Sequence, residues 1–428
     1  MRNHVLIKTL TSLRGNPRAC VYTEPLWGIP FFLYMPFVSV YMAALSVSDQ
    51  QIGIITSVFV AIRAISSLLS GAIIDKLGRK RATFIFDALS WSIPCLIWAF
   101  SQNFWWFIAG AIFNGLGEFT HNSWNCLLIE DADKSTLVDI YAWVHISGLL
   151  AVFFAPLAGL LVEGLNLVLA VRILYIFSFV SMTLKFLILN KYATETEIGV
   201  QRMKETRGVS VLSLLSGYGA VARKLLASPQ MVLTLTIMAG FIITNIVTVT
   251  FFGLYVTRNL NMPDSFLAYF PILRSAIMLL FLFLIQPKIA KFGLKGPVLV
   301  GVVLYIKAYT LLILSPASSV WLLLACIFLE SCAHGLIWPR RDSIQALFID
   351  PKERARLNSV LASAILLTTI PFGYLSGWMS SLDGRLPFVL IIVIFVVLFV
   401  VVAASRSLRT ENVRAIEAMH QSDDSQSL

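Results

Sequence analysis

The chain has 428 residues, of which 58% are hydrophobic and only 13% are charged, and its mean hydropathy is +0.81. Soluble domains contain about 25% charged residues, so this composition excludes an ordinary soluble protein and indicates that lipid is the solvent. The net charge of +10 raises the question of a nucleic-acid partner, which the distribution of the charge decides.

Twelve apolar stretches recur along the chain, each about 20 residues long, the length that a helix needs to cross a bilayer. They predict an all-α membrane protein with twelve transmembrane helices in two pseudo-symmetric six-helix halves. We expect the N-terminal half at residues 1–190, a cytoplasmic middle loop at 191–230, the C-terminal half at 231–404 and a cytoplasmic tail at 405–428. The predicted spans are Cys20–Leu45, Ile52–Ile74, Ala82–Phe100, Phe104–Leu128, Val138–Val162, Leu167–Asn190, Met231–Val256, Phe266–Pro287, Pro297–Leu314, Val320–Leu347, Leu357–Ser380 and Pro387–Ala404.

Lysine and arginine decide on which side of the membrane the loops lie. These residues concentrate in the N-terminus, alternate loops and the C-terminal tail, whereas the opposite loops contain only Arg258 and Arg385. Because positively charged loops stay in the cytoplasm, we expect both termini there, in an integral protein of the cell (plasma) membrane. The basic charge then faces anionic lipid, and no nucleic-acid partner is expected.

A short basic connector, Gly71–Arg81, joins the second and third predicted spans and reads G-x-x-x-D-K-x-G-R-K. The residues that define this pattern are Gly71, Asp75, Gly78, Arg79 and Lys80. A less complete copy follows the eighth span at Gln286–Gly296, where Ala290 and Leu294 replace the aspartate and the arginine. The repeat supports two related halves, and any switch function of the motif depends on the first copy.

Ionisable side chains recur at matching positions inside the two halves. Arg63 lies near the middle of the second span and Arg274 near the middle of the eighth. The fourth and tenth spans each add a Glu/His pair, Glu118 with His121 and Glu330 with His334. A charge near the bilayer centre costs about 2.5–3.5 kcal/mol, so this recurrence predicts a shared polar cavity. The alternative is a polar seam between packed helices.

Helical spacing extends these polar faces. In the fourth span, Asn114, Asn122 and Asn125 share a face with the Glu/His pair, and in the tenth span Trp338 follows at the next turn. We predict proton coupling by Glu118, Glu330, His121 and His334. The predicted substrate-binding residues are Arg63, Arg274, Asn114, Asn122, Asn245, Tyr34 and Trp338.

The middle loop contains one further pattern. Val209–Ala227 has an apolar face opposite Arg223 and Lys224, which is typical of an amphipathic helix at the membrane interface. A mobile linker is the alternative.

The connector motif, the twelve spans and the two halves together resemble the major facilitator superfamily of transporters over nearly the whole chain. The resemblance implies the major facilitator fold and rocker-switch alternating access, with the first, fourth, seventh and tenth helices lining the cavity. It also implies that Asp75 lies near the cytoplasmic end of the eleventh helix and helps to lock the outward-open state. The fifth span, Ala151–Leu160, departs from the glycine-rich pattern of the family's drug antiporters.

The sequence therefore predicts a secondary active transporter that moves a small organic solute across the cell membrane. We expect a monomer in membrane lipid, with a small-molecule substrate and protons as the coupling ion. The paired arginines favour an anionic substrate, and the aromatic first span leaves an amphipathic one open. Multidrug or lipid-like efflux is an alternative, and a non-transporting receptor or assembly factor is an alternative of another class.

An enzyme is not expected, because no nucleophile–base pair and no phosphate-binding loop occurs outside the spans. The five cysteines show no metal-binding spacing. No cofactor and no metal site are therefore predicted.

Overall fold

The computed structural model describes residues 10–133, 136–214, 218–289, 292–348, 354–406 and 408, and the structural statements below concern these residues. They are helical apart from turns and short irregular segments, so the predicted all-α class is confirmed. Eleven helical segments in the described part are long and apolar enough to cross a membrane. The remaining predicted span, Phe104–Leu128, is divided by a turn.

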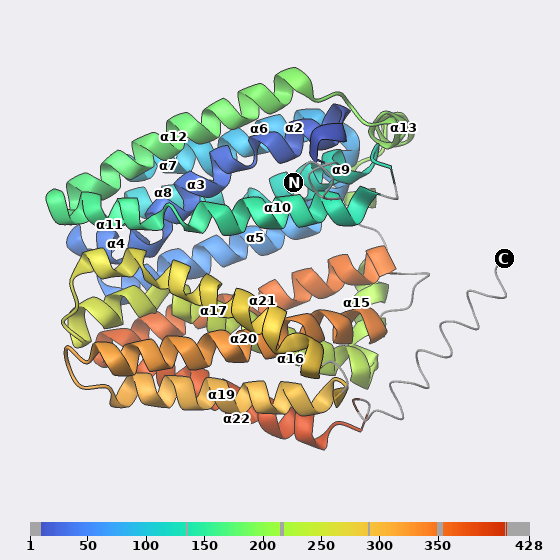
Figure 1. Ribbon diagram of the computed structural model, residues 1–428. Helices are drawn as coiled ribbons and strands as arrows, with labels where there is room; N and C mark the ends of the chain where they lie inside the picture. The colour runs from blue at the N-terminus through green and yellow to red at the C-terminus, as the bar shows by residue number, and fades with distance from the viewer. Residues whose placement is uncertain are drawn as a thin grey trace. The chain divides into compact units, whose positions relative to one another are not determined.

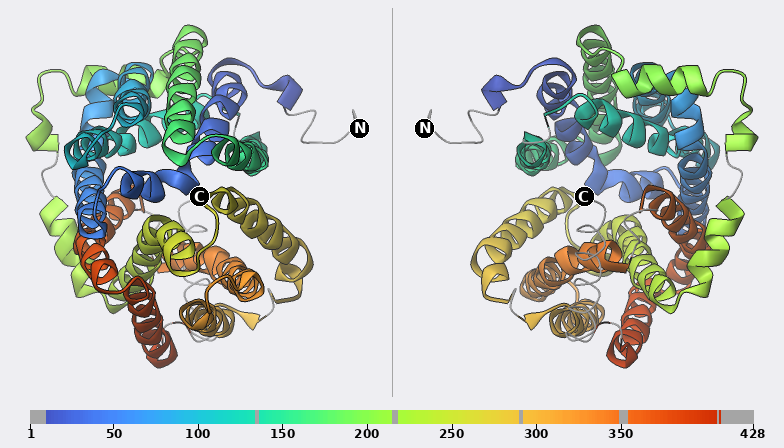
Figure 2. Two further views of the ribbon diagram at one scale, coloured as in Figure 1. Left: turned by 90° about the vertical axis from the view of Figure 1, so that its left-hand side faces the viewer. Right: turned by 90° about the vertical axis from the view of Figure 1, so that its right-hand side faces the viewer.

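The first of two compact units comprises Met1–Ser216 and Pro263–Ile272. Its long helices lie side by side in a bundle (Figures 1 and 2). Its helices are α2 (Gly15–Thr23), α3 (Pro25–Tyr34), α4 (Val38–Ala44), α5 (Asp49–Leu77), α6 (Arg79–Asp87), α7 (Ile93–Ala99), α8 (Phe104–Asn114), α9 (Gly117–Ile129), α10 (Leu137–Val152), α11 (Ala155–Gly164), α12 (Leu167–Tyr192), α13 (Glu197–Glu205) and α14 (Val211–Leu214), with 3-10 turns η1 (Met35–Phe37) and η5 (Asp264–Ala268) and a π-helical turn η2 (Ala88–Ser92).

The second unit comprises Gly217–Met262 and Leu273–Leu428 and also forms a helical bundle (Figure 2). Its elements are α15 (Tyr218–Ala227), α16 (Pro229–Leu254), the π-helical turn η4 (Tyr255–Asn259), most of α17 (Phe270–Leu284), α18 (Gln286–Ile289), α19 (Lys295–Leu314), α20 (Val320–Phe348), α21 (Arg354–Leu382) and α22 (Leu386–Ala404). The domain boundaries that the sequence predicts stay a prediction.

The expectation of one continuous helix over Phe104–Leu128 is wrong. α8 ends at Asn114 and α9 begins at Gly117, with a tight turn between them. The turn packs closely against α5, since a Cβ atom on Gly115 would lie only 2.6 Å from the Cβ of Ile62. Asn114 and the polar residues that follow it therefore lie on separate helices.

The middle loop is more ordered than the sequence suggested. The predicted amphipathic stretch Val209–Ala227 contains α14 and α15, and residues 215–217 between them lie outside the described residues. α13 was not predicted at all. It lies at one end of the first unit with its axis across the long helices (Figure 1).

The lipid-facing side of the first bundle is apolar, as a membrane-spanning helix requires. α12 exposes large apolar side chains at helical spacing: Leu169, Ile173, Ile176, Val180, Leu184 and Leu187. The opposite side of α12 packs into the bundle and includes small and polar residues such as Ala170, Ser178 and Lys185. The helix is apolar outside and more polar inside because lipid, unlike water, cannot hydrate a polar group.

Proline breaks the backbone ladder of the first span, and a neighbouring helix compensates. Pro30 lies within α3 and has no N–H to donate to the carbonyl of Leu26, four residues earlier. The hydroxyl of Ser181 on α12 donates to this carbonyl at 2.8 Å. The contact removes an unsatisfied acceptor at membrane depth, where its cost is high.

The third span repeats this arrangement. Pro94 cannot donate to the carbonyl of Ser90, and the chain forms the π-helical turn η2 immediately before it. The side-chain amide of Asn114 donates to the Ser90 carbonyl at 2.7 Å. Asn114 thus has a structural role that the sequence did not suggest.

The serine–proline compensation predicts coupling between Ser181 and Pro30. Ser181→Ala should lower the stability of the wild-type protein by about 1 kcal/mol, because it leaves the Leu26 carbonyl unsatisfied. In a Pro30→Ala background the same change should be nearly neutral, since the new N–H at position 30 bonds that carbonyl. Thermal unfolding in detergent measures both effects.

Ser178→Ala is the matched control, because the Ser178 hydroxyl donates within its own helix, to Leu174 at 2.7 Å. Its effect should not depend on Pro30. Equal losses for Ser181→Ala in both backgrounds would contradict this explanation of the proline.

Candidate functional site

The connector between the second and third spans is much shorter than the sequence suggested. α5 extends to Leu77 and α6 begins at Arg79, so only Gly78 separates the two helices. The two spans are predicted to end at Ile74 and to begin at Ala82, and the helices extend further into the connector than that. Gly78 has φ +84° and ψ 160°, a conformation that residues with a Cβ rarely adopt. This glycine lets two long helices join without a loop.

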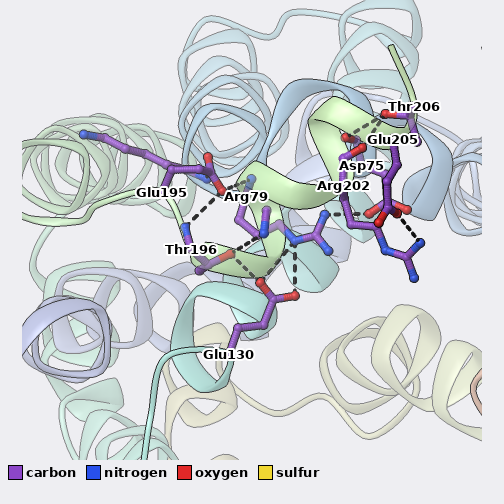
Figure 3. Close-up of polar contacts among 10 residues, drawn as sticks. Asp75, Arg79, Glu130, Glu195, Thr196, Arg202, Glu205 and Thr206 are labelled. Atoms are coloured by element: carbon purple, nitrogen blue, oxygen red, sulfur yellow. Dashed lines mark hydrogen bonds and ion pairs between the residues drawn. The ribbon is translucent and has the colours of Figure 1, made fainter. Parts of the chain in front are cut away.

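Arg79 holds this junction together from a buried position. Its Nη1 donates to Asp75 Oδ1 at 2.6 Å, one turn back on α5. Its Nε donates to both carboxylate oxygens of Glu130, which follows α9, at 3.2 and 3.3 Å (Figure 3). The Arg79 side chain is only 7% exposed, and a buried guanidinium is tolerated only when its donors are partnered. The three residues therefore connect α5, α6 and the end of α9.

Glu195, between α12 and α13, closes the other side of the junction. Its carboxylate accepts the backbone N–H groups of Arg79, at 2.7 Å, and of Lys80, at 3.0 Å. These N–H groups open α6 and have no partner within the helix, and a carboxylate is favoured there by the helix dipole. A Cβ on Gly78 would lie 2.5 Å from Glu195 Oε2, so the glycine also makes room for this carboxylate.

Both ends of α13 contact the same junction. At its N-terminus, the Thr196 hydroxyl donates to Glu130 Oε2 and accepts the N–H of Gly199 at 2.9 Å. After its C-terminus, the Thr206 hydroxyl donates to the backbone carbonyl of Asp75 at 3.1 Å. Figure 3 shows these contacts gathered around Arg79. The start of the middle loop is therefore part of the motif's structure.

The five predicted motif residues do not contribute equally. Asp75, Gly78 and Arg79 meet at the junction, and Lys80 joins through its backbone N–H. Gly71 is exposed, and a Cβ there would have no atom within 4 Å. The expected contact of Asp75 with the eleventh helix stays a prediction.

Sequence reasoning missed Glu130 and Glu195. Glu130 follows directly after an apolar span, and Glu195 lies between two threonines in the sequence Thr194–Thr196. An acid in such a position is a weak signal, because surface loops often contain one.

In the second copy of the motif, a positively charged side chain contacts the backbone, whereas the first copy uses the negatively charged Glu195. Gly293 has φ +65°, like Gly78, whereas Ala290 and Lys291 lie outside the described residues. Arg340 of α20 is buried and donates to the carbonyls of Ile289 at 3.2 Å and Gly293 at 3.4 Å. Here a cation binds backbone carbonyls, where the first copy has a carboxylate on backbone N–H groups.

Inside the first unit, Arg63 of α5 pairs with Glu118 of α9. Arg63 Nε donates to Glu118 Oε1 at 2.9 Å, and Nη2 contacts the same oxygen. The guanidinium also lies over the ring of Phe59, 5.6 Å from its centroid. The two residues that the sequence singled out separately are therefore direct partners.

The second unit contains the equivalent pair, with more partners. Arg274 Nη2 of α17 lies 2.9 Å from Glu330 Oε2 of α20. The other Glu330 oxygen accepts the Tyr309 hydroxyl at 2.9 Å, and Tyr309 bonds Thr248 at 2.8 Å. Arg274 also lies over the ring of Phe252, 4.6 Å from its centroid. This network spans α16, α17, α19 and α20.

The two predicted histidines differ in their surroundings. His334 Nδ1 lies 3.1 Å from the Tyr305 hydroxyl, and the ring packs edge-on against Trp338 at 4.6 Å. His121 is exposed on α9. Sequence reasoning missed Tyr305 and Tyr309, although their spacing of four residues in the ninth span places both on one face of a helix.

The remaining predicted residues are not gathered around the ion pairs. Asn122 donates to Ser70 Oγ at 2.8 Å, and Asn245 is exposed. Tyr34 is buried against Tyr175, with ring centroids 4.9 Å apart. The indole of Trp338 donates to Asp342 Oδ2 at 2.9 Å. Their roles in substrate binding stay predictions.

The family model of the Major Facilitator Superfamily matches residues 27–317 and 250–421. The chain belongs to the major facilitator superfamily. Its curated relatives include Multidrug resistance protein MdtG of Serratia proteamaculans, 27% identical over 339 residues that cover 76% of each chain. MdtG of Salmonella schwarzengrund is 26% identical over 339 residues, covering 76% of this chain and 78% of the relative.

Solved structures of the superfamily match nearly the full length. The nucleoside transporter NupG has a TM-score of 0.67 at 17% identity, covering 95% of this chain and 99% of that chain. The peptide transporter POT in complex with sulfate has a TM-score of 0.67 at 14% identity, covering 94% of this chain and 98% of that chain. The human organic anion transporter MFSD10 (TETRAN) has a TM-score of 0.61 at 16% identity, covering 90% of this chain and 99% of that chain. These likenesses confirm the predicted major facilitator fold.

Membership of the major facilitator superfamily makes the chain an integral membrane transporter, as the sequence predicted. The departure of its fifth span from the drug-antiporter pattern does not remove it from the superfamily, because the match extends across both halves.

The contacts of Glu195 predict that the first turn of α6 and α13 both depend on this carboxylate. Glu195→Ala should speed hydrogen exchange at the first turn of α6, because the N–H groups of Arg79 and Lys80 lose their acceptor, and across Glu197–Glu205, because the contact that holds the start of α13 to α6 is lost. Glu197→Ala, at an exposed position in the first turn of α13, is the control and should leave exchange in α6 unchanged and affect α13 less. Hydrogen exchange with mass spectrometry measures both variants. Equal protection of α13 in the two variants would contradict the assigned role of Glu195.

Proposed function

We propose that this chain is a proton-driven transporter of small amphipathic organic molecules, working by alternating access in the cell membrane. The observation that carries the proposal is the pair of matched intramembrane contacts, Arg63 with Glu118 and Arg274 with Glu330. Each pair joins the second and fourth membrane-spanning segments of its half. The proposal includes cytoplasmic termini and a monomeric protein.

A carboxylate paired with arginine is suited to proton coupling. Ionised Glu118 binds Arg63, whereas a protonated Glu118 is neutral and releases it. Because an unpaired charge at membrane depth is costly, protonation and a change of helix contacts occur together. The same reasoning applies to Arg274 and Glu330, where Tyr309 provides an alternative partner for the carboxyl group.

The charge balance of these pairs favours an amphipathic substrate over an anionic one. Each arginine already has a glutamate partner, so neither pair offers a full positive charge. The relatives named multidrug resistance proteins support the same substrate class and suggest efflux as the direction.

An anionic substrate is the second candidate, and one observation favours it. Nε of Arg274 is buried and has no hydrogen-bond partner among the described residues, whereas Nη2 faces Glu330. The carboxylate or phosphate group of a substrate would fit this unfilled donor.

The cytoplasmic junction around Gly78 is the proposed conformational switch. Asp75 and Arg79 link α5 and α6 to the end of α9, so movement of any one of these helices changes the contacts of the others. In this proposal Asp75 is the residue that also holds the outward-open state, as the superfamily resemblance implies.

The ion pairs predict the outcome of removing each carboxylate. Glu118→Gln and Glu330→Gln should each reduce pH-gradient-driven accumulation of a transported dye to the level reached without a gradient. Downhill exchange of the dye should continue, because only the coupling group is lost. Proteoliposomes with an imposed pH gradient, and ethidium as the amphipathic dye, provide the measurement.

Glu163→Gln is the control, because Glu163 is exposed at the end of α11 and has no place in the proposal. Gradient-driven transport that persists in both Glu118→Gln and Glu330→Gln would rule out these carboxylates as the coupling groups. Absence of flux for ethidium and for a panel of organic anions would favour the receptor or assembly-factor alternative.

Arg274→Ala separates the two substrate classes. If the substrate is an amphipathic molecule without a negative charge, the variant should retain most of its affinity for the cationic dye ethidium. If it is an organic anion, affinity should fall about tenfold or more, the effect of losing one charge-assisted hydrogen bond. Equilibrium binding of ethidium and of fluorescein to the purified protein makes the comparison.

A further inference from the structure

A separate group of buried charges lies in the first unit, away from the Arg63–Glu118 pair. Glu24 lies between α2 and α3, Asp87 ends α6, and Lys185 lies on α12. Lys185 Nζ is 3.9 Å from Glu24 Oε2 and 3.9 Å from Asp87 Oδ2. The exposed fractions of the three side chains are 12%, 3% and 7%. Two carboxyl groups therefore share one ammonium group inside the membrane-spanning helices.

The charges in this group do not balance if all three residues are ionised. Two carboxylates and one ammonium carry a net charge of −1, in surroundings that cannot hydrate it. Among the described residues, Lys185 is the cation paired with both carboxyl groups, and no second cation is at contact distance. Cys20 is fully buried nearby on α2. The ring centroid of Trp124 on α9 lies 5.6 Å from Lys185 Nζ.

Asp87 is the least satisfied member. Both of its carboxylate oxygens are buried and have no hydrogen-bond partner among the described residues. A contact of 3.9 Å to Lys185 is too long to be a hydrogen bond. Burying an ionised carboxylate without hydrogen bonds is strongly unfavourable, whereas a protonated carboxyl group loses far less on burial.

A small cavity, large enough for about one water molecule, lies beside Asp87. Its lining includes Asp87 and Thr83, and also Lys80 in the first turn of α6 and Asn190 in the last turn of α12. Lys80 and Asp87 are seven residues apart, or about 10 Å along a helix. Asp87 therefore lies about two helical turns from the junction at Gly78.

We propose that Glu24, Asp87 and Lys185 form a buried proton-binding site that holds one proton, carried mainly by Asp87. The proton comes from water and converts the carboxylate to a neutral carboxyl group. Its binding leaves Glu24 and Lys185 as a balanced pair. The site is separate from Glu118 and Glu330, and only its use in transport rests on the proposed function.

The number of protonated carboxyl groups at neutral pH tests this proposal without any substrate. The wild-type protein should have one in this group. Asp87→Asn and Glu24→Gln should each have none, because each leaves a balanced carboxylate–ammonium pair. Lys185→Met should have two, because no cation remains. Infrared spectroscopy of the purified protein in detergent measures the protonated carboxyl band, which shifts on exchange into deuterium oxide.

Glu163→Gln is again the control and should retain the wild-type band. Loss of the band in either single carboxamide variant, with a gain in Lys185→Met, supports the site. An unchanged band in both Asp87→Asn and Glu24→Gln overturns it. The two carboxamide variants are independent, so misfolding of one leaves the other as a test.

Transport assays then show whether the cycle uses the site. Asp87→Asn should lose the dependence of ethidium transport on the pH gradient. Full gradient dependence in Asp87→Asn would overturn a coupling role for the site. If transport by the wild-type protein does not depend on the pH gradient, the proposed function is wrong. The number of protonated carboxyl groups measured by infrared spectroscopy still tests the site.

Discussion

Charged and polar groups within the membrane-spanning helices need a partner inside the protein, because lipid cannot hydrate them. This constraint explains the pairing of Arg63 with Glu118 and of Arg274 with Glu330. It also explains two side-chain contacts to the backbone, since Ser181 and Asn114 donate to the carbonyls that Pro30 and Pro94 leave without an N–H partner. The partners come from helices far apart in sequence, so each contact fixes how the helices of one unit pack. The proposed mechanism uses the same constraint, because protonating a carboxylate changes which partner a helix needs.

The two copies of the connector motif differ in how they are held. Gly78 and Gly293 both have a positive φ, although only Gly78 separates its two helices directly. In the first copy, acidic side chains bind Arg79 and the start of α6. In the second, Arg340 binds backbone carbonyls instead. The first junction has several ionisable contacts and also holds α13, so it is the better candidate for a switch.

The sequence was sufficient to predict the features that depend on composition and spacing. Apolar lengths predicted the helices, and the recurrence of Arg63 and Arg274 pointed to two related halves. It did not predict the turn at Gly115, because the apolar length of a span does not show a short break within it. It also missed Glu195 and Asp87, because the importance of each comes from burial and from distant partners. A carboxylate beside a span looks the same in sequence whether it is solvated or buried.

A double-mutant cycle on Arg63 and Glu118 tests the central claim most directly, with thermal stability in detergent as the measurement. The account predicts that Arg63→Gln and Glu118→Gln each lower stability, because each leaves one charge without its partner. The neutral double variant should recover much of that loss, with a coupling energy of about 1 kcal/mol. Strictly additive losses would contradict the account, because they would mean that the two side chains do not stabilise one another.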